Sequence, residues 1–527
     1  MAAESPPPDV TGSAAPTADV CLIVEGAYPY VRGGVSSWTQ DLIATQAHLR
    51  FHVAVIVAPG AEVELRYQLP PNVSGLSHIA AAQLSRGASR LPGGEATLRE
   101  LLEPVERILG DGDPDALGEL VRRVAPYRGL LGRELLLDSP AAWLAFNRLY
   151  ERTCAGASYL NAFWAFRTLV AGLFSMVLAD LPDAAVYHCV ATGYAGLVAA
   201  RAHYETGRPA LVTEHGVYTN ERRLEILSAP WLAVDDQRSL AVDGGGNKVK
   251  ELWINTFVSY SKACYAACSH IITLFEGNFA LQIEDGAIRE RLEIIPNGID
   301  LDRFGGIEAI PRAGYGGTRP PTIALVGRVV PIKDIKTYIR ACALLRKRVP
   351  DVQCFVLGPM DEDPVYASEC REMIAQFGLG DCLHFTGNVN LLDWFGKIDI
   401  NVLTSVSEGQ PLVMLEAGAA AVPSVGTDVG GVRELVEGRP SETPPLGLGG
   451  RVCPIGDPGA IAAACAELLL DEALRAQCGA AMQARCRAHY DKRDLHRRYA
   501  RLYGALLTGS ARDGSARDGS TLDGGAA

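Results

Sequence analysis

Short apolar segments recur along the chain, separated by stretches in which apolar residues have helical spacing. A first series of candidate strands covers residues 20–25, 52–58, 185–190, 210–213, 271–274 and 293–295. A second series covers residues 322–327, 352–358, 384–386, 398–403 and 423–426. Strands that alternate with helices indicate βαβ units in a mostly parallel sheet. The pattern therefore predicts two successive α/β units, whose ligands would bind beyond the carboxyl ends of the strands.

The remaining segments set the expected domain boundaries. Residues 98–180 lack clear strands, and a Gly- and Pro-rich break lies at residues 305–321. We predict a flexible leader (1–18), an N-terminal Rossmann-like domain (19–300) with a helical insertion at about 98–180, and a C-terminal Rossmann-like domain (301–475). Helices at 476–508 are expected to pack back on the N-terminal domain. The Gly- and Ser-rich tail (509–527) is expected to be disordered.

Composition removes several classes of protein. Apolar residues make up 48% of the 527 residues and charged residues 21%, the balance of a globular chain with a large core. The net charge of −12 gives no general attraction for nucleic acid. The longest apolar stretch, residues 168–179, is too short to span a bilayer, which takes ~20 residues. We therefore expect no membrane-spanning segment and no signal peptide.

The 13 cysteines are scattered and form no CxxC pair. Several lie inside apolar runs, which is typical of reduced, buried thiols. Cys264 and Cys268 are four residues apart and could face together on a helix. Because no other ligand residues accompany them, we interpret them as core thiols rather than as a metal site.

The strongest candidate chemistry lies in SEGQPLVMLEAGAAAVPSVGTDVGGVREL, residues 407–435, which follows a candidate strand. Pro411 suits the first position of a helix, and the free N–H groups of residues 412–414 suit a diphosphate. Glu408 lies in the loop before this helix and Glu416 on its second turn. Eight residues along a helix span ~12 Å. The two carboxylates are therefore expected to hold different hydroxyls of an elongated ligand, not to form an acid–base pair.

A second group is GRVVPIKD, residues 327–334, directly after a candidate strand. Arg328 and Lys333 are expected to project from a loop at the carboxyl end of that strand. Two fixed cations in this place can neutralise a diphosphate and the charge that develops on a leaving group. The alternative is a pair of solvated surface cations.

Two weaker candidates follow strands of the first series. Gly33 and Gly34, in GAYPYVRGGVSSW, resemble a phosphate-approach loop but lack the G-x-G-x-x-G pattern and a P-loop lysine. His215, in LVTEHGVYTNERRLEI, follows a strand and could bond a sugar hydroxyl. A core histidine is the alternative for His215.

Two other patterns have simpler interpretations. Asp300 and Asp302 form a D-x-D pattern, for which we expect a turn at the crossing between the two units rather than a metal site. The basic stretch 485–501 is expected to be the solvated face of a helix, or else a surface for an acidic partner or an anionic membrane. Metalloprotease, serine hydrolase and kinase motifs do not occur.

Several of these segments together resemble one family. They are VCLIVEGAYPYVRGGVSSW, TEHGVYTNERRLEI, LFEGNFALQIEDGA, IIPNGIDLDRF, LVGRVVPIKDIKTYIRA and SVSEGQPLVMLEA. They are similar to the retaining glycosyltransferases of family 4 and, among these, to the cytosolic Pel exopolysaccharide glycosyltransferases (PelF type). The resemblance runs from about Val20 to Tyr503 and is loose over 98–180. It implies the GT-B architecture of the α/β class, in which two Rossmann-like domains with parallel sheets face across a cleft and a C-terminal helix crosses back.

The resemblance also implies roles for single residues. The donor would be a UDP-sugar, with Arg328 and Lys333 on its diphosphate, Glu416 on its ribose and Glu408 on its hexose. Other donor-site positions implied by the family are Gly33, Gly34, Asn388, Val389, Gly409, Gln410, Pro411, Leu412 and Val413. His215 would join Glu408, Lys333 and Arg328 in the catalytic group. No metal or other cofactor is implied, because the cations and the helix N-terminus take that role.

The implied activity is hexose transfer to a growing exopolysaccharide with retention of configuration. The implied location is cytoplasmic, peripheral at the inner membrane beside a polysaccharide synthesis and export complex. A UDP-sugar epimerase and a non-catalytic nucleotide-sugar-binding component are the alternatives on the same scaffold. The sequence leaves open the hexose (glucose, N-acetylglucosamine or N-acetylgalactosamine), the acceptor, the linkage and the oligomeric state. Gly418 departs from the family pattern, in which a bulkier residue is common.

Overall fold

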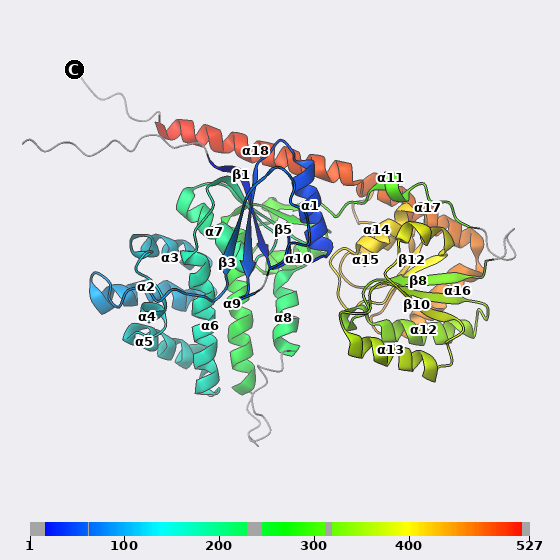
Figure 1. The fold of residues 1–527 in the computed structure, drawn as a ribbon, viewed down its shortest axis with the longest axis horizontal. Coiled ribbons are helices and arrows are strands. Elements are labelled where there is room, and N and C mark those ends of the chain that lie inside the picture. The colour runs from blue at the N-terminus through cyan, green and yellow to red at the C-terminus, as the bar shows by residue number, and fades with distance from the viewer. Residues whose placement is uncertain (1–15, 62, 229–244, 311–318, 519–527) are drawn as a thin grey trace, which may run out of the picture. The chain divides into compact units, whose positions relative to one another are not determined.

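A computed structural model describes residues 16–61, 63–228, 245–310 and 319–518 of the chain (Figure 1). The first sheet has seven strands in the order β3-β2-β1-β4-β5-β6-β7. Their bounds are β1 Ala18–Glu25, β2 Phe51–Val57, β3 Val73–Ala80, β4 Ala184–Cys189, β5 Ala210–Glu214, β6 Cys268–Thr273 and β7 Leu292–Ile294. The registers of β1 with β2 and β4, of β2 with β3, of β4 with β5 and of β6 with β7 are parallel.

The second sheet has six parallel strands in the order β10-β9-β8-β11-β12-β13. Their bounds are β8 Thr322–Val326, β9 Gln353–Leu357, β10 Leu383–Gly387, β11 Ile400–Leu403, β12 Ser424–Thr427 and β13 Gly450–Cys453. The β8, β9 and β11 strands are nearly continuous apolar runs, which is typical of parallel strands covered on both faces. Two parallel sheets confirm the predicted α/β class.

Helices follow most strands of the first sheet. Their bounds are α1 Gly34–Thr45, α2 Gly94–Gly110, α3 Ala116–Val124, α4 Arg133–Leu136, α5 Pro140–Leu149, α6 Tyr159–Leu178, α7 Tyr194–Thr206, α8 Tyr218–Ser228, α9 Gly245–Ala267, α10 Asn278–Glu284 and α11 Leu301–Phe304. The helices α2 to α6 form the predicted insertion, and Figure 1 shows α2, α3, α4 and α5 gathered beside α6.

The helices of the second part of the chain are α12 Ile335–Arg346, α13 Pro364–Gln376, α14 Leu412–Ala419, α15 Val432–Glu437, α16 Pro458–Leu470, α17 Glu472–His489 and α18 Lys492–Asp518. One core cluster packs α12, α13 and α16 against the second sheet. A second cluster joins that sheet to α14, α15 and α17. Helices therefore cover both faces of the second sheet.

The chain divides into two compact units. Among the described residues, one comprises residues 16–61, 63–212, 245–269 and 503–518, and the other residues 213–228, 270–310 and 319–502. In the first unit, α6 is long and apolar enough to cross a membrane by length and composition alone, but 67% of its most apolar window is buried, against α7, α9 and their neighbours. It therefore packs as a core helix.

The structure departs from the predicted pattern in three places. The strands β3 and β13 were not predicted from the sequence. The helix α18 continues to Asp518, so residues 509–518 are helical where a disordered tail is expected. Residues 1–15 of the predicted leader and 519–527 of the predicted tail lie outside the described residues.

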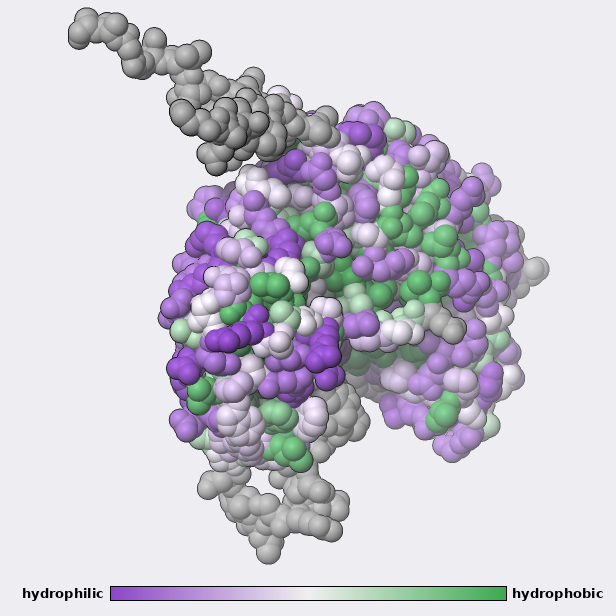
Figure 2. All heavy atoms as spheres, turned by 60° about the vertical axis from the view of Figure 1, so that its left-hand side comes forward, coloured by the Kyte–Doolittle hydropathy of each residue, from purple (hydrophilic) through white to green (hydrophobic). Residues whose placement is uncertain are grey.

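On the face of the molecule in Figure 2, hydrophilic side chains predominate and hydrophobic ones gather in separate patches.

Candidate active site

An ion pair between Lys333 and Glu408 lies where two neighbouring strands end. Lys333 ends a 3-10 turn after β8, and Glu408 lies in the loop between β11 and α14. Because β8 and β11 are adjacent and parallel, their carboxyl ends meet at one edge of the sheet. The Lys333 Nζ atom donates to Glu408 Oε1 at 2.5 Å, and both side chains are mostly buried. The structure thus brings together two of the residues that sequence analysis selects.

Three hydroxyl side chains hold the two loops of this ion pair. Thr404 Oγ1 donates to the carbonyl of Lys333 at 2.8 Å, and Thr427 Oγ1 donates to the carbonyl of Ser405 at 2.6 Å. Ser405 Oγ donates to Glu408 Oε1 at 2.6 Å. These residues were not predicted from the sequence, although their position at the ends of β11 and β12 is a signal for them.

Arg328 follows β8, as predicted, and its side chain is half-exposed. Its Nη1 atom donates to both carboxylate oxygens of Glu362 at 2.6 Å. The Nε and Nη2 atoms have no hydrogen-bond partner among the described residues, so this edge of the guanidinium is open to an anion. Glu362 is a fourth residue that was not predicted from the sequence, and its signal is the acidic run MDEDP after β9.

The helix α14 begins at Leu412, with Pro411 just before it, close to the predicted start. The first N–H groups of a helix lack intrahelical acceptors, so they can bind an anion. Met414 N–H is already bonded to the Pro411 carbonyl at 3.1 Å. Glu416 lies on the second turn, where burial raises the pKa of its carboxyl to about 7 and Arg303 opposes the shift.

Close backbone contacts define the loop around Glu408. A Cβ atom on Gly409 would lie 2.1 Å from the His215 carbonyl oxygen, and one on Gly430 would lie 2.1 Å from the Glu408 carbonyl oxygen. Only glycine fits these two approaches, and Gly430 also has a positive φ of 51°. His215 therefore borders the loop of Glu408, as its predicted role requires. Burial lowers the pKa of its imidazole to about 4, so the ring is neutral at physiological pH.

Other predicted donor-site residues have structural contacts. Gln410 Oε1 accepts a hydrogen bond from the N–H of Asn297 at 2.6 Å, so this side chain ties two loops together. Leu412 and Val413 pack against the apolar cluster of α14, α15 and α17, as does the half-buried Val389. Asn388 is exposed just after β10.

Gly33 and Gly34 lie at the start of α1, as predicted. A Cβ atom on Gly33 would meet nothing within 4 Å, and its φ of 178° is extended backbone. These two residues belong to the first compact unit, whereas Glu408 and Lys333 belong to the second. Their role in a shared site stays a prediction.

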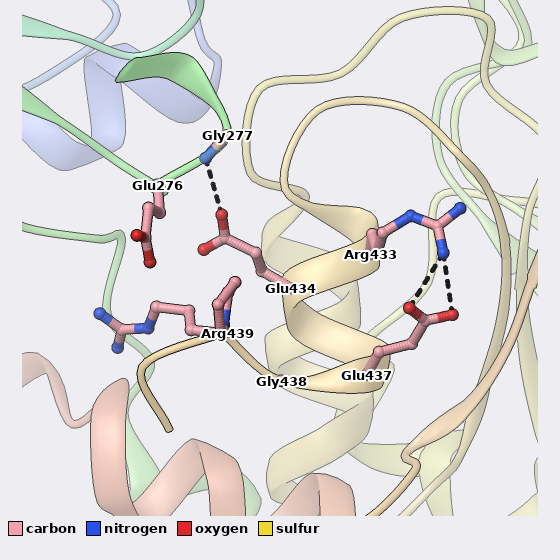
Figure 3. Close-up of a pocket in the computed structure, with 8 residues that line it drawn as sticks. Glu276, Gly277, Arg433, Glu434, Glu437, Gly438 and Arg439 are labelled. Carbon is pink, nitrogen blue, oxygen red and sulfur yellow. Dashed lines mark hydrogen bonds and ion pairs between the residues drawn. The ribbon is translucent and has the colours of Figure 1, made fainter. Parts of the chain in front are cut away.

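A pocket of about 530 Å³ lies beside α15 in the second unit. It is lined by Glu276, Gly277, Arg433, Glu434, Glu437, Gly438, Arg439 and Pro440. Figure 3 shows Arg433 turned towards Glu437 and Glu434 bonded to the N–H of Gly277, a bond of 2.8 Å. The side chains of Glu276 and Arg439 extend on the other side of Glu434. Glu434 thus links the segment after β6 to α15.

Two patterns in the sequence could suggest a metal site, the D-x-D pattern and the cysteine pair. Asp300 caps α11 by accepting from the N–H groups of Asp302 and Arg303, which agrees with the predicted turn. Among the described residues, the group of side chains near enough to share a metal ion is Cys189, Cys264 and Cys268. All three thiols are buried, and Cys264 Sγ lies 3.8 Å from each of the other two sulfur atoms.

The basic stretch 485–501, expected as the solvated face of one helix, spans the end of α17 and the start of α18 and makes ion pairs within the chain. Arg485 is buried and bonded to both carboxylate oxygens of Glu442. Arg497 pairs with Asp494, and Arg498 donates to Glu293 at 2.8 Å. Much of the positive charge noted in the sequence is therefore neutralised by neighbouring carboxylates.

Two family matches cover most of the chain. Residues 18–290 match the family described as a domain of unknown function (DUF3492), and residues 320–471 match the family of glycosyl transferases group 1. The chain is also similar to a D-inositol 3-phosphate glycosyltransferase of Paenarthrobacter aurescens, with 32% identity over 29% of this chain and 39% of that protein. The lipopolysaccharide core biosynthesis mannosyltransferase LpsB of Rhizobium meliloti is 33% identical over 28% of this chain and 44% of its own length. The chain thus spans less than half the length of these relatives.

Two solved structures share the fold. Anabaena Alr3699/HepE, in complex with UDP and glucose, has a TM-score of 0.54 at 16% identity and covers 93% of this chain and 100% of its own. Sucrose-phosphate synthase from Thermosynechococcus elongatus has a TM-score of 0.54 at 17% identity, over 93% and 99%. These likenesses confirm the predicted GT-B fold. Since the first family match covers just over half of the residues, the chain belongs to the DUF3492 family and carries, after that domain, the domain of the group 1 glycosyltransferases.

Proposed function

We propose that this glycosyltransferase moves a hexose from a UDP-hexose to a growing polysaccharide, with retention and without a metal ion. The observation that carries the proposal is the Lys333–Glu408 ion pair beside the start of α14. Arg328 lies in the same segment after β8 as Lys333. A cation for a diphosphate and a carboxylate for sugar hydroxyls are thereby placed side by side. The Anabaena protein of the same fold holds UDP and glucose, which supports a UDP-linked donor here.

In the proposed reaction an acceptor hydroxyl attacks the anomeric carbon from the face that the diphosphate leaves. The bond between the anomeric carbon and the phosphate oxygen breaks, and the hydroxyl proton passes to the leaving UDP. Lys333, Arg328 and the first N–H groups of α14 stabilise the charge on that UDP. Glu408 would hold sugar hydroxyls and Glu416 the ribose.

Calorimetric titration with UDP, without divalent metal, tests the donor site. We expect wild-type protein to bind UDP and Lys333→Ala to lose about 10- to 100-fold in affinity, because a charge-assisted contact is removed. Glu416→Ala should also weaken binding. Lys336→Ala is the matched control, since Lys336 pairs with Glu369 on the outer side of α12 and α13. Absence of UDP binding by the wild type would overturn the proposal.

Product analysis separates transfer from the two alternatives. A transferase releases UDP and lengthens an acceptor, an epimerase returns an altered UDP-hexose, and a non-catalytic protein does neither. UDP-glucose, UDP-N-acetylglucosamine and UDP-N-acetylgalactosamine are the donors to compare. Release of UDP together with a product that retains the anomeric configuration is the expected outcome.

We further propose a role in exopolysaccharide synthesis of the Pel type, at the cytoplasmic side of an inner-membrane export complex. The exposed side chains of Trp143, Leu160 and Trp164 on α5 and α6 support a protein partner, because they leave apolar surface uncovered in the helical insertion. The paired state of Arg497 and Arg498 makes the basic helix a poorer docking face. Cell fractionation with and without the export complex tests this role.

A further inference from the structure

We propose that Ser405 is a positioning residue of the donor site, which keeps Glu408 oriented when Lys333 engages the diphosphate. This inference rests on the function proposed above. Ser405 lies two residues beyond the end of β11 and is 1% exposed. Its backbone is fixed because its carbonyl accepts the hydroxyl of Thr427, at the end of β12, at 2.6 Å. The side chain therefore starts from a rigid point between two adjacent strands.

The numbers of hydrogen-bond donors and acceptors explain how Ser405 orients the carboxylate of Glu408. Its hydroxyl has one proton to donate, and this proton is directed to Glu408 Oε1 at 2.6 Å. The same oxygen accepts from Lys333 Nζ at 2.5 Å. With two donors on Oε1, the second oxygen of Glu408 is left to accept a hydroxyl of the hexose.

A bound diphosphate would weaken one of the two hydrogen bonds to Glu408 Oε1, the one from Lys333. An ammonium group turned towards phosphate oxygens weakens its bond to a carboxylate, because its three donors are then shared. Glu408 would lose one of its two restraints at the moment when its orientation matters. The Ser405 hydroxyl cannot follow the phosphate, since its backbone is held by Thr427 and it lies three residues before Glu408. It therefore keeps the carboxylate in place through the reaction.

The test compares Ser405→Ala and Ser405→Thr with Ser424→Ala. Ser424 is a fully buried serine of β12, whose hydroxyl accepts from Asn401 at 3.2 Å, so it controls for the loss of a buried hydroxyl. The readouts are the Kd for UDP by calorimetry, kcat and KM for the most active of the three UDP-hexoses, and the melting temperature. For Ser405→Ala we expect a Kd for UDP within about 2-fold of wild type and a kcat about 10-fold lower, the effect of one hydrogen bond to a charged group. Ser405→Thr keeps a hydroxyl and should recover most of the kcat.

The outcomes are distinct. An unchanged kcat in Ser405→Ala, with UDP bound and hexose turned over by the wild type, overturns the role of Ser405 alone. An equal loss of kcat in Ser424→Ala, or failure of Ser405→Thr to recover, shows a merely structural effect and also overturns it. A wild type that binds UDP but turns over none of the donors overturns this proposal together with the transferase function.

Discussion

Glu416 is a carboxyl group whose titration is linked to folding. Its pKa rises from an ordinary 4.5 to about 7 because of burial, and within the described residues its carboxylate has no hydrogen-bond partner. A raised folded-state pKa contributes stability that is fully present below pH 4.5 and is lost as pH rises through 7. We therefore expect Glu416→Gln, which cannot ionise, to be more stable than wild type at pH 8, by about 3 kcal/mol at most.

Urea unfolding at pH 5 and at pH 8 checks this prediction. The stability difference between Glu416→Gln and wild type should be large at pH 8 and nearly absent at pH 5. A difference that is the same at both pH values would mean that Glu416 ionises normally. A carboxyl group whose pKa burial raises to about 7, beside the predicted donor loop, is a candidate for ligand binding.

Gly33 gives a second test at the scale of a residue. Its backbone is extended and nothing lies within 4 Å of a Cβ atom placed there, so Gly33→Ala should leave the melting temperature unchanged. If the loop approaches the donor closely, as the sequence predicts, the added methyl group should lower turnover of a UDP-hexose about 10-fold or more. Gly380→Ala, on an exposed turn with equally open surroundings, is the control and should change neither property. Unchanged turnover in Gly33→Ala would remove Gly33 from the donor site.

At the scale of elements, the strands that could be predicted from the sequence are mainly those with continuous apolar runs. Strands such as β1 and β8 are central and covered on both faces, so their continuous apolar runs identify them. The missed strands β3 and β13 lie at sheet edges, where one side of the strand has no partner. The sequence of β3, VSGLSHIA, mixes Gly and Ser with apolar residues and is mostly half-exposed. A strand with so mixed a sequence carries too little pattern to separate it from a loop. The edge strands β7 and β10 were predicted, so edge position alone does not explain the two missed strands.

Part of the candidate site was predictable because its residues lie close in sequence to recognisable strands and helices. Lys333 and Glu408 lie in loops that follow strands, and Glu416 lies on the second turn of the helix after such a loop, so local sequence places them near the carboxyl ends of the sheet. Ser405 and Glu362 were missed because their roles depend on partners that local spacing does not reveal. The partner of Glu362, Arg328, lies 34 residues away, and the Thr427 hydroxyl reaches Ser405 across 22 residues. Only the strand order brings these residues together.

The contact between α14 and α17 explains the departure at Gly418. A Cβ atom there would lie 2.8 Å from Cys486 Sγ and 2.9 Å from Met482 Cε, both on α17. Gly418→Val should therefore separate the helices and destabilise the fold by about 1–3 kcal/mol. Urea unfolding measures this loss, and Gly380→Val serves as the control in open space. Equal stability of Gly418→Val and wild type would show that α17 can move away without cost.

At the scale of the whole molecule, the residues of α18 divide between the two compact units, up to Leu502 in the second and from Tyr503 in the first. In the second unit Tyr499, fully buried on α18, shares a hydrogen bond of 3.0 Å with Thr213 of β5. In the first unit, Tyr503 shares a buried hydrogen bond of 2.7 Å with Nδ1 of His188 in β4. The ring of Tyr503 also packs edge-on against Phe51 of β2. The part of α18 that belongs to the first unit thus packs on strands of that unit's sheet.

These two hydroxyl groups allow the connection to be tested in each unit separately. Tyr503→Phe keeps the ring against Phe51 but removes the hydrogen bond to His188 Nδ1, a loss of about 0.5–1.5 kcal/mol for one hydrogen bond. Hydrogen exchange should therefore become faster in β4 for Tyr503→Phe and in β5 for Tyr499→Phe. Tyr159→Phe is the control, because the Tyr159 hydroxyl bonds to Asn147 on an exposed helix face and its loss should leave both strands protected. Faster exchange in α18 alone, with β4 and β5 unchanged, would mean that the helix lies on the first sheet without stabilising it.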